Sequence, residues 1–143
     1  MMTVRQILSG KEEGVLSIAP QSTVYVALEV MAQHDVGALV VVDGGRVVGM
    51  FSERDYARKV ILKGKASKDT QVKEVMSEKV SCVTLSQTVE DCMALMTDKR
   101  IRHLPVLGAG QEVLGIISIG DLVKETISHQ KFTIEQLVHY IQS

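Results

Sequence analysis

Apolar and polar residues follow an order along the first half of the chain that predicts a small α/β unit. The apolar run at residues 16–19 predicts a strand. Residues 24–31 carry apolar side chains at positions i, i+3, i+4 and i+7, which predicts a helix with one buried face. Apolar runs at 38–42 and 47–51 flank a Gly-rich turn and predict a β-hairpin. A second helix should begin just after Ser52, so the order is β-α-β-β-α.

The same order returns in the second half of the chain. Residues 22–44 align with 87–109 at an offset of 65, and residues 46–56 align with the second half at an offset of 66. The lead-in segments also match, because residues 4–9 resemble residues 72–77. A repeat of this kind indicates a duplicated structural unit. The corresponding strands are predicted at 80–85, 103–107 and 113–117, with helices beginning at Val89 and just after Ser118.

The duplication divides the chain into a first repeat, residues 1–70, and a second repeat with a C-terminal helix, residues 71–143. Units this small bury too little surface to be stable alone, so the two repeats should share a core. Thr133 and Gln136 have the spacing of a capping box, which predicts that a separate final helix begins there. Its apolar stripe packs either on its own chain or on a second copy, and its members are Ile134, Leu137, Val138 and Ile141.

Each repeat ends its hairpin in the same motif, Gly-Met-Phe-Ser-Glu-Arg-Asp at residues 49–55 and Gly-Ile-Ile-Ser-Ile-Gly-Asp at residues 115–121. A hydroxyl followed three residues later by a carboxylate is a capping-box variant that satisfies free N–H groups of a helix. The same two groups suit a ribose diol and a phosphate at a helix N-terminus. Both interpretations stay open from the spacing alone.

The two motifs at matched spacing, with matched lead-ins, resemble the cystathionine-β-synthase (CBS) domain family, and the tandem resembles a CBS pair, or Bateman module. The resemblance runs from about Thr3 to Ile127. It implies an α/β fold in which two β-α-β-β-α repeats pack sheet to sheet about a pseudo-two-fold axis. It also implies clefts between the repeats that bind adenosine compounds such as AMP, ATP, NAD or S-adenosylmethionine.

The resemblance suggests that the two nucleotide sites differ. The second repeat has Arg102 and His103 where the first has Gly37 and Ala38, and these side chains bring hydrogen-bond donors to an anion. By the family's pattern the second site is Thr84, Arg102, His103, Ser118 and Asp121. The first site has Ser52 and Asp55, with Arg54 and Arg58 four residues apart as a possible phosphate clamp. The structural alternatives are that His103 is a core or surface histidine whose hydrogen bonds are satisfied within the protein, and that Arg54 and Arg58 lie on a solvated basic helix.

The charge and composition of the chain argue against several classes of function. The net charge is −1, aromatic residues make up 3% of the chain and Trp is absent, so we do not expect nucleic-acid binding. We expect no membrane association, because no apolar run reaches the length of a membrane span. Cys82 and Cys92 lack metal or disulfide spacing and favour a reducing cytoplasm. The four histidines are scattered, so no metal site is expected, and no catalytic motif is present.

The sequence therefore predicts a cytoplasmic, non-catalytic sensor that binds an adenine nucleotide (AMP, ATP or NAD) as an effector and not as a cofactor. We expect a homodimer of C2 symmetry and an output to a separate target protein. The main alternative is an interaction or structural module without a bound nucleotide. Nucleic-acid binding through the basic residues 54–68 and redox sensing through the two thiols are the remaining alternatives.

Overall fold

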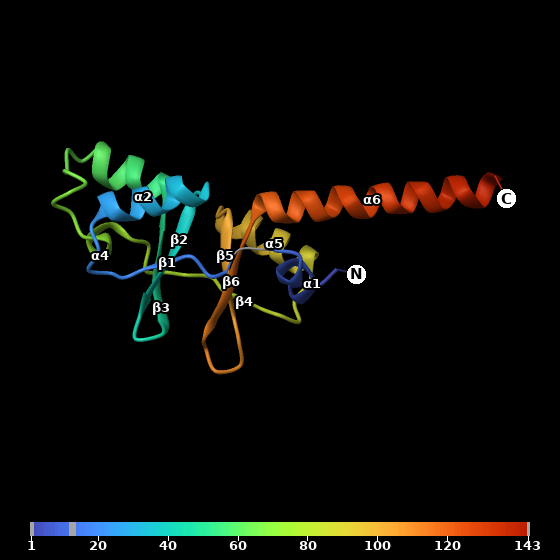
Figure 1. Ribbon diagram of the computed structural model, residues 1–143, viewed down its shortest axis with the longest axis horizontal. Coiled ribbons are helices and arrows are strands. Elements are labelled where there is room, and N and C mark those ends of the chain that lie inside the picture. The colour runs from blue at the N-terminus through green and yellow to red at the C-terminus, as the bar shows by residue number, and fades with distance from the viewer. Residues whose placement is uncertain (1, 12–13, 143) are drawn as a thin grey trace.

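The computed structural model describes residues 2–11 and 14–142, and it contains two three-stranded sheets with helices packed against them (Figure 1). The first half holds α1 (Val4–Ser9), β1 (Ser17–Ile18), α2 (Val24–His34), β2 (Ala38–Asp43), β3 (Arg46–Ser52), α3 (Glu53–Asp55) and the π-helix η1 (Tyr56–Ile61). The second half holds α4 (Val72–Val75), β4 (Val83–Thr84), α5 (Val89–Lys99), β5 (His103–Leu107), β6 (Val113–Ser118) and α6 (Ile119–Gln142). The predicted duplication is thus present in the fold.

Both sheets are built in the same way, with strand orders β1-β2-β3 and β4-β5-β6. The first strand of each pairs in parallel with the second, and the second pairs antiparallel with the third. Each hairpin carries a register shift at the same place, between Val41 and Val42 and between Val106 and Leu107. The parallel edge strands are only two residues long, shorter than the sequence predicts, because each pairs with one neighbour over two positions.

Local capping positions the long helix of each repeat. Thr23 accepts a hydrogen bond from the Val26 N–H, and Thr88 forms a capping box with Asp91. Both helices end at a residue in the left-handed region, Asp35 with φ 52° and Arg100 with φ 55°. A left-handed residue stops the helix and turns the chain into the next strand. The start of each helix can therefore be predicted from its threonine cap. The end cannot, because Asp35 and Arg100 stand where a glycine would signal it.

Each lead-in helix packs on the opposite repeat. Val4 and Ile7 of α1 belong to the core built by β4, α5, β5 and β6, and Val72 and Val75 of α4 belong to the core of the first repeat. The hydrogen bonds agree, because the Val4 N–H donates to Gln87 O and the Val72 N–H donates to Ser22 O, both at 2.8 Å. The expected boundary at residues 70 and 71 follows the sequence repeat, whereas both cores draw on residues from either side of it.

The second face of each sheet is also covered. Side chains alternate between the two faces of a strand, and Leu39 and Val41 face the core of the first repeat. Val40 lies between them and is fully buried, although it belongs to neither core cluster. Pro105 holds the same position in β5 between Leu104 and Val106 and is also buried. The sheets therefore cover one another on the faces that the helices leave open.

The C-terminal region corrects one prediction. The Thr133–Gln136 spacing does not begin a new helix, because α6 runs without a break from Ile119 to Gln142 and projects beyond the body (Figure 1). Thr133 Oγ1 donates to the His129 carbonyl within the helix instead of capping one. The stripe does not pack on its own chain either: its four side chains are 45–78% exposed. The helix after Ser52 also differs from the prediction, since it is α only to Asp55 and continues as η1.

Candidate functional site

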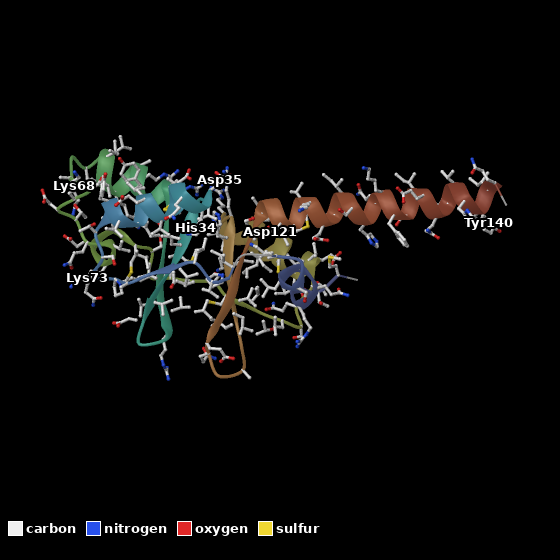
Figure 2. All side chains as sticks on the ribbon, in the orientation of Figure 1. His34, Asp35, Lys68, Lys73, Asp121 and Tyr140 are labelled. Atoms are coloured by element: carbon white, nitrogen blue, oxygen red, sulfur yellow. The ribbon has the colours of Figure 1, made fainter. Side chains whose placement is uncertain are left out.

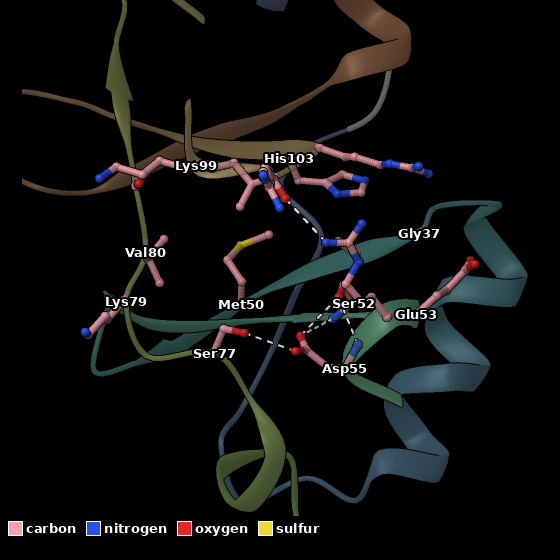
Figure 3. Close-up of a pocket in the computed structure, with 16 residues that line it drawn as sticks. Gly37, Met50, Ser52, Glu53, Asp55, Ser77, Lys79, Val80, Lys99 and His103 are labelled. Atoms are coloured by element: carbon pink, nitrogen blue, oxygen red, sulfur yellow. Dashed lines mark hydrogen bonds between the residues drawn. The ribbon is translucent and has the colours of Figure 1, made fainter. Parts of the chain in front are cut away.

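A cavity of about 430 Å³ lies between the two repeats (Figure 3). It is bounded by the ends of β2 and β3, the segment after α4, and the turn from α5 into β5. A volume of this size falls in the range of small-molecule sites. Its lining residues are Gly37, Ala38, Met50, Ser52, Glu53, Arg54, Asp55, Ser77, Lys79, Val80, Ser81, Lys99, Arg100, Ile101, Arg102 and His103.

The polar end of this cavity is the capping box of the first repeat. Asp55 Oδ2 accepts from the Ser52 N–H at 3.0 Å and from Ser52 Oγ at 3.1 Å, while the Asp55 N–H lies 3.2 Å from Ser52 Oγ. On the other carboxylate oxygen, Oδ1, Ser77 Oγ donates at 3.0 Å and Lys59 Nζ lies at 3.2 Å. Asp55 is only 7% exposed, so these four groups hold the carboxylate in place as an acceptor at the wall of the cavity.

The cavity is strongly cationic. Five of its lining residues are Lys or Arg and two are acidic, Glu53 and Asp55. The cations come from both repeats, and Arg54 reaches across to donate to the Arg100 carbonyl at 3.4 Å. Cations gathered around a concave site raise the local concentration of anions. The site therefore suits a ligand that carries negative charge.

His103 lies at the edge of the cavity near Gly37 (Figure 3). A Cβ atom at Gly37 would lie 3.7 Å from His103 Cε1 and 3.6 Å from Glu53 Oε1, so the glycine leaves a narrow space there. Burial lowers the pKa of His103. The Asp121 carboxylate opposes this shift, whereas the charges of Lys11 and Arg102 add to it. The imidazole is therefore neutral at pH 7, with one nitrogen to donate and one to accept.

The structure brings together five of the nine site residues that the sequence suggests: Ser52, Arg54, Asp55, Arg102 and His103. It combines the motif of the first repeat with the basic pair of the second, whereas the sequence grouped each pair with its own repeat. The other four, Thr84, Arg58, Ser118 and Asp121, are not among the residues that line this cavity. Thr84 is exposed, with its hydroxyl 3.3 Å from Ser86 Oγ, and Arg58 is exposed on η1.

The carboxylate of the second repeat has a different environment. Asp121 lies at the start of α6 (Figure 2), where its Oδ2 accepts from the Ser118 N–H at 2.8 Å. Lys11 Nζ also lies 2.8 Å from that oxygen and donates to the Ile116 carbonyl at 2.8 Å. Burial alone would raise the pKa of Asp121, but the hydrogen bonds from Lys11 and Ser118 outweigh it and leave the pKa below its ordinary value.

Six polar or charged lining residues were not predicted as site residues from the sequence: Glu53, Ser77, Lys79, Ser81, Lys99 and Arg100. Ser77 and Lys79 follow α4, which packs on the first repeat, so that Ser77 contacts Asp55 and Lys79 lines the cavity. The matching lead-ins, residues 4–9 and 72–77, were the one available signal. Arg100 turns the chain out of α5 in a left-handed conformation that single-sequence patterns do not reveal.

Redox sensing, metal binding and membrane insertion find less support in the structure. Burial raises the pKa of the Cys82 and Cys92 thiols, which disfavours the thiolate that redox sensing requires. Within residues 2–11 and 14–142, no three His, Cys, Asp or Glu side chains gather so that they could hold a metal ion. No helix in that same part of the chain is long and apolar enough to cross a membrane.

Comparison with known proteins agrees with this architecture. The CBS domain model matches residues 4–62 and again residues 72–128. The CBS domain-containing protein CBSX3, mitochondrial, of Arabidopsis thaliana is 44% identical over 125 residues, covering 84% of this chain and 60% of that protein. This chain therefore spans about 60% of the length of that relative.

Solved structures give the same result. A CBS-domain protein from Burkholderia ambifaria MC40-6 has a TM-score of 0.86 and 48% identity, covering 90% of this chain and 96% of that one. The CBS domain pair of protein MJ0100, in complex with 5′-methylthioadenosine and S-adenosyl-L-methionine, has a TM-score of 0.81 at 21% identity, covering 90% and 98%. With two matched repeats, two equivalent sheets and these relatives, the chain belongs to the CBS-domain family as a tandem pair.

Proposed function

We propose that this chain is a non-catalytic regulatory module that binds an adenosine-containing nucleotide in the cavity between its repeats. The observation that carries the proposal is the composition of that cavity. It places the Ser52–Asp55 capping box in one cavity with five Lys and Arg side chains drawn from both repeats. A nucleoside phosphate offers the matching groups, a ribose diol for the carboxylate and an anion for the cations.

In this proposal the ribose binds at Asp55. The carboxylate already accepts from four groups, so a ribose hydroxyl must take the place of one of them. Ser77 Oγ is the partner that is replaced at least cost, because it is neutral and makes one contact with the carboxylate. The phosphate then lies toward Arg102 and His103, where the second repeat supplies the charge. Adenosine compounds suit this fold, as the MJ0100 pair with its two bound ligands illustrates.

Regulation follows from the position of the cavity. A ligand shifts a conformational equilibrium only by binding one state better than the other. Because residues of both repeats line the cavity, a bound nucleotide favours the arrangement that closes them around it. The response is then a change in how the repeats or subunits pack, which a separate target protein can detect. A reducing, cytoplasmic environment is proposed on the two unpaired thiols.

We further propose that the module is a homodimer that uses α6. Ile127, Ile134 and Ile141 recur every seven residues, and Leu137 lies on the same stripe. Ile127, Ile134, Leu137 and Ile141 are 55–78% exposed. A stripe with this period fits a second helix of the same kind, so the occupant is α6 of another copy. The same exposed helix favours the alternative function, a protein-interaction module without nucleotide.

The test is a thermal-shift screen of the protein with adenosine, AMP, ADP, ATP, NAD and S-adenosylmethionine, followed by titration of each compound that stabilises it. Arg102→Ala removes an exposed cavity cation and should weaken binding of phosphate-bearing compounds about ten-fold or more. Arg46→Ala, at the start of β3 and outside this cavity, is the matched control. Absence of any shift in well-folded protein, or equal losses in both variants, would refute the nucleotide function.

A further inference from the structure

The carboxylates of the two repeated motifs differ in their access to a ligand: Asp55 lines the cavity between the repeats, whereas Asp121 does not. The repeat relates Ser52 and Asp55 to Ser118 and Asp121, and both pairs form the same contacts between backbone N–H and carboxylate. The strand registers also correspond, because Ala38 pairs with Ser52 as His103 pairs with Ser118. The difference between the clefts therefore lies in what approaches each carboxylate from outside its own motif.

At Asp55 that group is a neutral hydroxyl, Ser77 Oγ at 3.0 Å, together with Lys59 from the following turn. Lys59 has no cationic counterpart in the second repeat, where Glu125 stands four residues after Asp121. At Asp121 the group is the Lys11 ammonium, which bonds Oδ2 and the Ile116 carbonyl at 2.8 Å each. The side chains of this pair are 27% and 24% exposed, so solvent screens the contact only in part.

The lead-in segments explain the difference. Residues 4–9 match residues 72–77, so Lys11 corresponds to Lys79. The two lysines have different positions: Lys79 lines the open cavity, whereas Lys11 bonds the carboxylate of its own cleft. The Lys11 ammonium thus lies where a ligand would approach Asp121, whereas Lys79 lies in the wall of the cavity at Asp55.

We propose that Lys11 occupies the second cleft as a built-in cation, so that the chain binds a single nucleotide, at Asp55, and keeps a latent site at Asp121. This inference rests on the proposed nucleotide function. A ribose hydroxyl that took the place of Lys11 on Asp121 Oδ2 would have to break a charge-assisted contact and leave the ammonium with the Ile116 carbonyl as partner. At Asp55 a ribose hydroxyl replaces only a neutral hydroxyl.

The experiment measures how many AMP molecules bind per chain, by isothermal titration and equilibrium dialysis. AMP is the probe because it carries both a ribose diol and a phosphate. We expect one site in the unmodified chain and two in Lys11→Met, which is one atom shorter, stays unbranched and removes the charge. The second site should disappear in the double variant Lys11→Met, Asp121→Asn. Lys11→Arg keeps the charge and should keep a single site.

Two results would overturn the inference: two sites in the unmodified chain, or a single site in folded Lys11→Met. Should Lys11→Met fail to melt cooperatively, Asp121→Asn alone decides. It should leave AMP affinity within about two-fold, whereas Asp55→Asn should reduce it at least ten-fold, and a comparable loss in both would refute the closed second cleft. If the unmodified chain binds no AMP, the nucleotide function fails separately. In that case, AMP binding that appears only in Lys11→Met and requires Asp121 would still support the latent site. If Lys11→Met also binds no AMP, the latent site is refuted as well.

Discussion

The first glycine of each repeated motif offers a matched pair of substitutions, Gly49→Ala and Gly115→Ala. A Cβ atom at Gly49 would lie 2.7 Å from Met76 Sδ and 3.0 Å from the Ser77 carbonyl oxygen. The backbone there is fixed, because Met50 and Ser77 exchange hydrogen bonds of 2.9 and 2.8 Å. At Gly115 the new atom would lie 2.9 Å from Leu8 Cδ2, the end of a side chain that can rotate.

Forcing an extra methyl group against fixed backbone costs about 1–3 kcal/mol. Replacing glycine with alanine also restricts the unfolded chain and returns about 0.4–1 kcal/mol. We therefore expect Gly49→Ala to lower the free energy of unfolding by about 1–2 kcal/mol, and Gly115→Ala to change it by less than about 1 kcal/mol. For a chain of this size, the Tm of Gly49→Ala should fall by roughly 2–8 °C.

The assay is urea denaturation of both variants beside the unmodified protein, with thermal melts as a second measurement. Gly49→Ala also moves Ser77, which contacts Asp55, so it should weaken AMP binding, whereas Gly115→Ala should not. Equal stability of the two variants, or a greater loss in Gly115→Ala, would refute the reasoning. Residue 49 would then not require glycine because of its contact with the backbone at Ser77.

Two further predictions concern the cavity and α6. A phosphate beside His103 should raise the pKa of the imidazole from its lowered value, so AMP binding should take up a proton and tighten as the pH falls through the pKa of the imidazole in the complex. His103→Gln should leave only the titration of AMP itself, as followed by calorimetry in buffers of different ionisation enthalpy. An unchanged pH slope would count against a phosphate at that position. Leu137→Asp should convert the proposed dimer to a monomer in sedimentation equilibrium, because it places a charge on the exposed stripe, whereas Gln136→Asp, on the opposite face of α6, should not. An unaltered assembly in Leu137→Asp would exclude α6 as the interface.

Local patterns in the sequence were sufficient for most elements of the fold. Period and turn residues identify α2, α5 and both hairpins, because each depends on neighbours a few residues away. They failed at Thr133, where the spacing of a capping box occurs inside a continuous helix. A cap forms only where the chain enters the helix from an extended residue, and the spacing alone does not show that.

The candidate site was only partly readable from the sequence. Ser52 and Asp55 were visible as a repeated motif, and Arg102 and His103 as a departure from the repeat. Their association in one cavity was not, because each pair was grouped with its own repeat. The two pairs lie about fifty positions apart in the chain, a distance over which local patterns give no information.

The sequence by itself determined the duplicated α/β unit, the apolar face of each helix and the motif that ends each hairpin, since these follow from short-range periodicity and capping. Only the tertiary structure decided that α1 and α4 pack on the opposite repeats. That crossing brings Ser77 to one carboxylate and Lys11 to the other. Two motifs that share their Gly, Ser and Asp therefore have different environments, because the surroundings of a carboxylate depend on groups that packing brings from distant parts of the chain.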